Sequence, residues 1–137
     1  MQSAEQRRLI RIAAAMNSKA RRLGIQGHIS WHELAVIAQV TPECAYCGIG
    51  LEQGQGTFDH ALALERRGAN DTSNIVRCCI TCNRSKFTKT PEEFAVAQQL
   101  LARCAVCETV YKPRWAEWVN GRARTCSHAC AGKLRWA

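Results

Sequence analysis

Eight of the nine cysteines in this sequence form two sets of four, and their spacing constrains the fold more than any other feature. The first set is Cys44, Cys47, Cys79 and Cys82, and the second is Cys104, Cys107, Cys126 and Cys130. Two close pairs of cysteines supply the four thiolates of a tetrahedral zinc site. Because only 7% of the 137 residues are aromatic, a large packed core is not expected. The sequence therefore predicts a small fold stabilised by two structural zinc ions.

Zinc is favoured over disulfides because the cysteines are closely paired and the N-terminus lacks the layout of a secretory signal. Iron held by the same pairs for electron transfer also fits the spacing. Cys79, and not Cys78, has the two-residue gap to Cys82, so Cys78 is expected to be a small buried residue. His128 lies between two cysteines of the second set and could replace one as a ligand, but Cys126 and Cys130 are preferred because four thiolates complete the site.

The net charge of +8 is concentrated at the two ends of the chain. Residues 1–25 carry six Lys or Arg and one acidic residue, and residues 104–137 carry six and two. Residues 26–103 carry seven basic and eight acidic residues. Basic ends around a nearly neutral centre favour a polyanionic partner held through its phosphates, although a basic surface also serves solubility alone. No apolar run is long enough to span a bilayer, so we expect a soluble, cytoplasmic protein with no membrane partner.

Two helices are predicted before the first cysteine. Apolar residues recur at the spacing of one helix face from residue 4 to about residue 23, and basic residues occupy most of the other positions. Ser30 and Glu33 have the spacing of a capping box, which predicts a second helix that ends near residue 39.

The sequence of the central part of the chain predicts a β-hairpin followed by two helices. Residues 57–61 and 74–77 are strand-like, with a polar loop between them. Residues 79–87 predict a short helix. Another helix begins at Pro91, after Thr90 of a second capping box, and has an apolar stripe made of Phe94, Ala97, Leu100 and Leu101.

Asp59 and His60 end the first strand and are the candidate catalytic pair, because a carboxylate that can bind a metal stands beside a base that titrates near neutral pH. On its own, such a pair is more often a surface or structural feature. By the same reasoning, Asn74 alone is a turn residue and Asn83 alone a helix-start residue. The two Cys-x-x-Cys pairs that enclose these residues are what favour catalysis.

This arrangement of cysteines, Asp59-His60, Asn74 and Asn83 over residues 41–94 resembles the HNH endonuclease family. The resemblance implies an α+β fold with a ββα-metal core, in which a hairpin and a helix hold one catalytic cation. We expect three parts along the chain: a basic helical region (1–40), an HNH nuclease domain (41–102) and a C-terminal zinc-finger module (103–137). The chain has Ala63 where the family commonly has proline, and Arg67-Gly68 in place of a common Gly-Gly.

The resemblance also implies roles for individual residues. His60 corresponds to the general base that takes a proton from the attacking water. Asp59 and Asn83 correspond to the ligands of a catalytic magnesium or manganese ion. Asn74 corresponds to the residue that ties the hairpin loop and orients the base. Arg84 and Lys86 on the following helix are candidate phosphate contacts, or only a solvated face.

The C-terminal cysteines resemble a small treble-clef-type zinc finger, of the kind appended to proteins that act on DNA. Basic and aromatic residues alternate between them, and the aromatic ones are expected mostly in the core. The candidate DNA contacts of this C-terminal module are Arg114, Arg122 and Arg124.

The leading hypothesis is therefore a metal-dependent DNA endonuclease, either a monomer or a homodimer. Such compact HNH proteins are typical of phages and mobile elements. The alternative is a zinc-finger DNA-binding or regulatory protein that keeps the HNH scaffold without catalysis.

Overall fold

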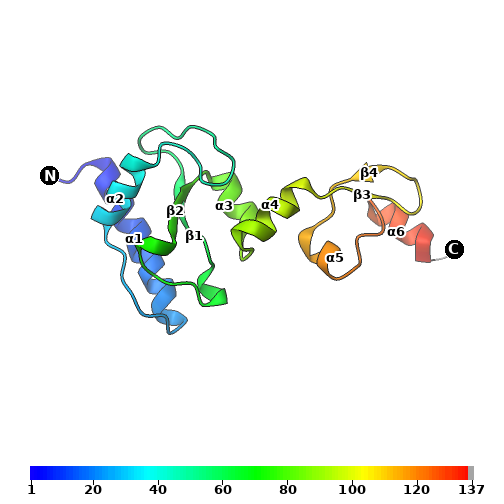
Figure 1. The fold of residues 1–137 in the computed structure, drawn as a ribbon, viewed down its shortest axis with the longest axis horizontal. Helices are drawn as coiled ribbons and strands as arrows, with labels where there is room; N and C mark the ends of the chain where they lie inside the picture. Colours follow the sequence, from blue (N-terminus) through cyan, green and yellow to red (C-terminus); the bar gives the residue numbers. More distant parts are fainter. Residues whose placement is uncertain (136–137) are drawn as a thin grey trace. The chain divides into compact units, whose positions relative to one another are not determined.

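The computed structural model describes residues 1–135, and the contacts within it divide the chain into two units. The first unit is Met1–Phe94, and the second begins at Ala95. Residues 136–137, the last two of the predicted C-terminal module, lie outside the described residues. Figure 1 labels the elements, and each unit is described by itself.

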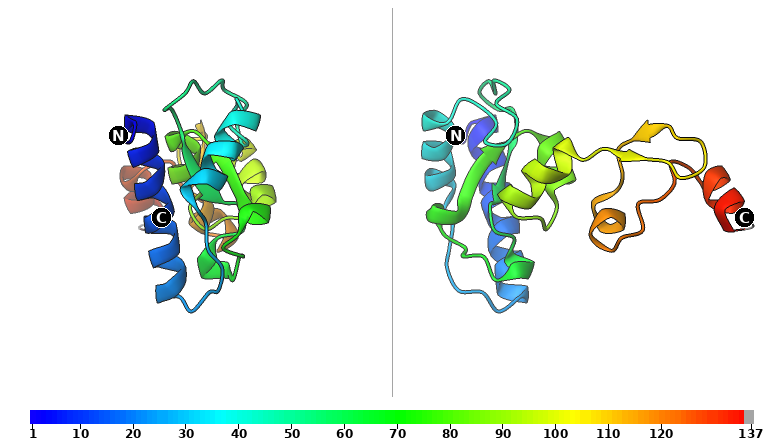
Figure 2. Two further views of the ribbon diagram at one scale, coloured as in Figure 1. Left: turned by 90° about the vertical axis from the view of Figure 1, so that its left-hand side faces the viewer. Right: turned by 45° about the vertical axis from the view of Figure 1, so that its right-hand side comes forward.

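The first unit opens with the two predicted helices. α1 (Ala4–Arg22) is capped by Ser3, whose side chain accepts a hydrogen bond from the backbone of Gln6. α2 (Trp31–Val40) begins with the predicted capping box, because Ser30 and Glu33 each bond the backbone of the other. The two helices pack side by side (Figures 1 and 2).

A β-hairpin follows, made of β1 (Thr57–His60) and β2 (Ile75–Cys78). The strands are antiparallel, with Thr57 opposite Cys78 and His60 opposite Ile75. The loop between them contains two 3-10 turns, Leu64–Arg66 and Thr72–Asn74. Both predicted strands are present, with ends that differ from the prediction by one residue.

The hydrophobic core of the first unit lies between the helices and the hairpin. Phe58 of β1 and Ile75 of β2 pack against buried side chains of the two helices and the segment that joins them. These are Leu9, Ala13, Met16, Ile29 and Leu34. The helices of residues 1–40 thus share a core with the hairpin, and the limits at residues 40 and 102 stay divisions proposed from the sequence.

Two further helices follow the hairpin. α3 (Ile80–Lys86) packs on β1, which completes the predicted ββα region and confirms the α+β fold. α4 (Pro91–Gln99) begins with the second predicted capping box, in which the Glu93 backbone donates to the Thr90 side chain. α4 ends at Gln99, so Leu100 and Leu101 of its predicted apolar stripe lie beyond the helix.

The second unit is built from short elements. β3 (Ala102–Arg103) and β4 (Val110–Tyr111) form a small antiparallel pair. α5 (Trp115–Val119) and α6 (His128–Arg135) follow. None of the helices in residues 1–135 is both long and apolar enough to cross a membrane.

Candidate metal centres and active site

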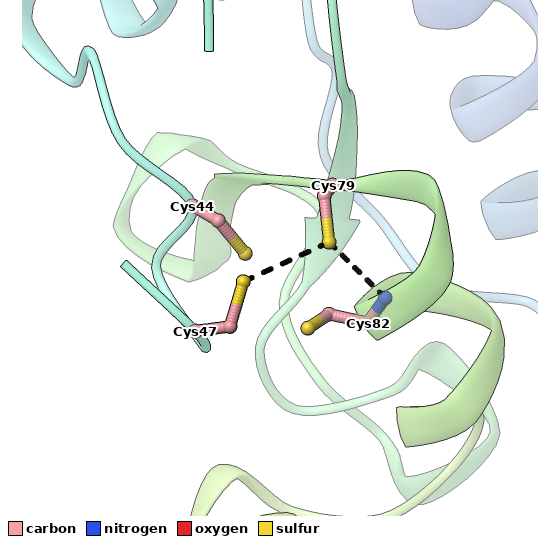
Figure 3. Close-up of side chains that lie close together, drawn as sticks. All are labelled: Cys44, Cys47, Cys79 and Cys82. Carbon is pink, nitrogen blue, oxygen red and sulfur yellow. Dashed lines mark hydrogen bonds between the residues drawn. The ribbon is translucent and has the colours of Figure 1, made fainter. Parts of the chain in front are cut away.

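The first set of cysteines forms one cluster, to which two separate segments contribute. Cys44 and Cys47 come from the loop after α2, and Cys79 and Cys82 come from the start of α3. Figure 3 shows the four side chains pointing toward one another, and all four sulfurs lie within 4.8 Å of each other. The Cys47 and Cys79 sulfurs are 3.9 Å apart. Tetrahedral Zn–S bonds of about 2.3 Å place sulfurs about 3.8 Å apart, so zinc fits this cluster.

The local backbone explains why these sulfurs meet. Gly48 follows the first pair with φ +74°, a left-handed conformation that glycine adopts readily in a tight turn. Cys79 is the N-cap of α3, and its sulfur accepts the backbone N–H of Cys82. Burial raises the pKa of the Cys44 thiol, but backbone N–H groups outweigh that effect and bring it to about 7. The backbone N–H groups around Cys44 therefore favour its thiolate.

The second set forms a similar cluster within the second unit. The Cys126 sulfur lies 3.5 Å from that of Cys107 and 3.8 Å from that of Cys130. The backbone N–H of Cys107 lowers the pKa of Cys104 to about 6, whereas the hydrogen bond with Cys107 raises that of Cys126 to about 12. Four adjacent thiols do not all ionise without a compensating cation, and zinc supplies that charge.

Both predicted four-cysteine sets are confirmed as clusters that fit structural zinc ions. All nine cysteines are free rather than joined in disulfides. Cys78 is fully buried and belongs to neither cluster, as predicted. The exposed side chain of His128 also lies outside the second cluster.

Asp59 is held by two donors on the α3 side of the hairpin. Its Oδ2 accepts a hydrogen bond of 2.7 Å from the Tyr46 hydroxyl and lies 3.0 Å from Nζ of Lys86. Lys86 also donates to the backbone oxygen of His60 and has no exposed surface. Its ammonium group is enclosed and paired with Asp59, and its phosphate contact stays a prediction. Arg84 is exposed on the same helix, and its phosphate contact stays a prediction.

His60 follows Asp59 on the strand and turns into the interior of the unit. The two residues have different partners: Asp59 pairs with Lys86 of α3, and His60 contacts Asn70, which in turn bonds Asn17 of α1. The His60 Nε2 atom lies 2.9 Å from Oδ1 of Asn70. Burial lowers the pKa of His60, and the hydrogen bond to Asn70 opposes this only partly. The lowered pKa favours the uncharged imidazole at neutral pH.

Asp59 and His60 both border one small cavity of about 60 Å³. Lys19 and Glu65 form an ion pair of 2.7 Å beside it. The other lining residues are Ala63, Leu64, Phe87 and Thr88. The structure thus brings the predicted pair to one place. Asn83 lies on α3 outside this lining, and its role as a metal ligand stays a prediction.

Asn74 ties the hairpin loop as the resemblance implies. Its Oδ1 accepts the N–H of Leu62, and its Nδ2 donates to the carbonyls of Leu62 and Ala69. Gly68 is needed beside it, because a Cβ there would lie 1.8 Å from the Leu62 oxygen. The side chain that contacts His60 is that of Asn70, and the predicted role of Asn74 in orienting His60 stays a prediction.

Sequence reasoning missed four residues of this region: Tyr46, Asn70, Asn17 and Lys19. Tyr46 lies between the first two cysteines, which is the one signal that it stands near the site. Asn70 lies in a loop that is rich in polar residues, so the sequence gives no signal that distinguishes it from its neighbours. Asn17 and Lys19 belong to α1, and nothing in their spacing connects them to His60.

Comparison with known families supports the arrangement. The sequence model of the family described as HNH endonuclease matches residues 44–101. This segment contains the first cysteine cluster, the hairpin, α3 and α4. Comparison with curated proteins gives no match.

Proposed function

The chain belongs to the HNH endonuclease family through residues 44–101, and on that premise we propose that it is a metal-dependent endonuclease that hydrolyses DNA. The observation that supports this most is the cavity bordered by both Asp59 and His60 inside the matched segment. A base kept uncharged by burial and a carboxylate that can hold a cation are the two groups that hydrolysis of a phosphodiester requires.

In the proposed reaction, His60 takes a proton from a water molecule. The water oxygen forms a bond to phosphorus, and the bond from phosphorus to the 3′ oxygen breaks. The lowered pKa of His60 keeps its free nitrogen ready to accept the proton at neutral pH. The cavity of about 60 Å³ has room for a water molecule beside Asp59 and His60.

Asp59 and Asn83 would hold the divalent cation of the reaction. Tyr46 and Lys86 both bind Oδ2 of Asp59, which leaves Oδ1 as the oxygen for a cation. Oxygen ligands favour a hard ion such as magnesium or manganese. When bound, such an ion stabilises the charge on the scissile phosphate and on the leaving oxygen.

Basic residues in both units would hold the DNA. α1 exposes several arginines, including Arg7, Arg11 and Arg21. In the second unit, Arg122 and Arg124 border an open hollow of about 480 Å³, and Arg135 borders it as well. Arg114 is exposed at the start of α5. Contacts of this kind give affinity through phosphate neutralisation and do not read sequence.

The test is cleavage of a supercoiled plasmid with magnesium or manganese. His60→Ala removes the base, and His60→Gln does so while keeping an N–H donor for Asn70. Both should abolish nicking, with folding and zinc content retained. The exposed His28→Ala is the matched control and should cut as the unchanged protein does.

Two outcomes would contradict the proposal. If His60→Gln cuts as fast as the unchanged protein, His60 is not the base. Tight, salt-sensitive DNA binding with no cleavage under any divalent ion would instead support a non-catalytic DNA-binding protein on the HNH scaffold.

A further inference from the structure

We infer that Asn17 of α1 and Asn70 of the hairpin loop are positioning residues that set the tautomer of His60 and leave its Nδ1 as the atom that accepts the proton. The catalytic meaning of that proton rests on the proposed function. The tautomer does not, because it follows from which groups in a buried chain of hydrogen bonds can only donate and which can only accept.

The chain of hydrogen bonds begins at Ile29, in the segment between α1 and α2. The Ile29 N–H donates to Oδ1 of Asn17 over 2.9 Å, and Nδ2 of Asn17 donates to the Ile29 oxygen over 2.8 Å. A backbone N–H cannot accept and a backbone carbonyl cannot donate, so these two bonds define which end of the Asn17 amide is oxygen.

Asn17 then fixes the direction of Asn70. The Asn17 oxygen lies 3.0 Å from Nδ2 of Asn70, and the Gly27 carbonyl oxygen lies 3.3 Å from the same atom. Both neighbours only accept, so the atom of Asn70 that faces them must be the nitrogen. The oxygen of the Asn70 amide is therefore turned toward His60.

The consequence for His60 follows directly. Its Nε2 lies 2.9 Å from Oδ1 of Asn70, an atom that only accepts. The neutral imidazole therefore carries its proton on Nε2, and Nδ1 keeps the lone pair that can take a proton from water. A flipped Asn70 amide would present an N–H to Nε2, favour the proton on Nδ1 and remove that lone pair.

Packing keeps the chain of hydrogen bonds in this one arrangement. Asn70 is 1% exposed and Asn17 is 6% exposed, so water does not replace their partners. A Cβ on Gly27 would lie 2.4 Å from the Asn70 backbone oxygen, so only glycine allows the segment before α2 to lie this close to the loop. An amide turned the wrong way would leave several buried groups unpaired.

Asn17, Gly27 and Ile29 all lie outside the matched residues 44–101. α1 therefore contributes to the active site, in addition to its proposed contacts with DNA. A chain that begins at residue 41 would keep both partners of the Asp59 carboxylate but would lose the groups that orient Asn70.

The tautomer is measured by nitrogen NMR of the full chain with labelled histidine, at about pH 8, where an ordinary imidazole is neutral. We expect the His60 Nε2 signal to be that of a protonated nitrogen and the Nδ1 signal that of an unprotonated one. The reverse pattern overturns the inference, whatever the cleavage activity. The expected pattern without any cleavage would overturn the proposed function and leave the tautomer assignment in place.

Two substitutions test the part played by α1. Asn17→Leu removes the nearer of the two acceptors of the Asn70 amide and leaves only the 3.3 Å bond to Gly27. The His60 tautomers should then become mixed, and kcat should fall about ten- to hundredfold, with KM unchanged. Asn17→Asp keeps an accepting oxygen, so the tautomer should remain that of the unchanged protein. Ser18→Ala, on the exposed face of α1, is the control.

The inference can still be tested if one of the two variants fails to fold. If Asn17→Leu is unfolded, Asn17→Asp still tests the inference, because a reversed tautomer in that variant contradicts it. If Asn17→Leu folds with the tautomer and kcat of the unchanged protein, α1 does not position His60.

Discussion

The ammonium group of Lys86 lies 3.0 Å from Oδ2 of Asp59 and has no exposed surface. The carboxylate beside the candidate base is thus neutralised from inside the unit, by a residue at the end of α3. Breaking such a pair leaves one charge without a partner in a poorly solvated place, which destabilises a protein more than the pair itself stabilises it.

Lys86→Met should therefore lower the free energy of unfolding by about 3 kcal/mol. Arg84→Met changes an exposed residue of the same helix and should alter it by less than about 0.5 kcal/mol. Urea unfolding of both zinc-loaded variants measures the difference. Equal stabilities would mean that the pair with Asp59 does not support the fold.

Metal analysis should find two zinc ions per chain, one for each cysteine cluster. Cys47→Ser and Cys107→Ser remove one exposed thiolate from the first and second cluster respectively, and each variant should retain one zinc. Because the clusters lie in different units, Cys107→Ser should keep the unfolding transition of the first unit, whereas Cys47→Ser should lose it. Coloured, iron-containing protein would contradict the assignment of zinc.

Arg67 has φ +66°, a left-handed conformation that disfavours residues with a Cβ. Its side chain donates to the backbone oxygen of Leu23, and both Arg67→Gly and Arg67→Ala remove that bond. Only Arg67→Gly relieves the backbone strain, so it should be more stable than Arg67→Ala by about 1 kcal/mol. Thermal unfolding of the two variants compares them directly, and an alanine variant as stable as the glycine variant would show that no strain is present.

The lowered pKa of His60 predicts how stability depends on pH. In the unfolded chain, the histidine takes up a proton near its ordinary pKa of about 6.5, while the folded protein does so only at lower pH. The contribution to stability is therefore complete above about pH 6.5 and is lost as the pH falls below it. His60→Gln removes this dependence, so the difference between the two proteins over about pH 5 to 8 isolates it.

The cleavage rate should depend on the protonation of the same side chain, His60. Cleavage should persist below about pH 6.5 and fall only when the pH passes through the lowered pKa of His60, because the base must be uncharged. A profile that falls above that value, or one that stays flat over the whole range, would point to another base.

The DNA grip of the second unit is tested by salt dependence. Arg122→Gln should weaken DNA binding and reduce the slope of log affinity against log salt by about 0.9 if the residue neutralises one phosphate. Lys133→Gln removes the same charge from an exposed position of α6 outside the arginine-lined hollow and should leave the slope unchanged. Equal effects would indicate a general charge effect and no defined contact.

Much of the fold could be predicted because its signals are local. The capping boxes at Ser30 and Thr90 act within one helical turn, and the two-residue gap distinguishes Cys79 from Cys78 as a partner of Cys82. The hairpin was predictable as well, since a polar loop separates two strand-like runs. Spacing of this kind depends only on the geometry of one turn or one strand.

The burial of Lys86 against Asp59 could not be predicted from local spacing. Helical spacing places it near Cys82 and Ser85, but it does not say whether that face meets solvent or the hairpin. α3 packs on β1, and this packing encloses Lys86 against Asp59. The same position would be a solvated face if the helix were turned by a fraction of a turn.

The sequence by itself determined the Cys-x-x-Cys pairs, the ββα order and the position of Asp59 and His60 at the end of a strand, because each depends on residues that are close along the chain. Only the tertiary structure decided which groups orient His60. Asn17 and Asn70 are 53 positions apart and meet because α1 packs on the hairpin. A contact made by packing between distant segments leaves no periodic pattern in the sequence.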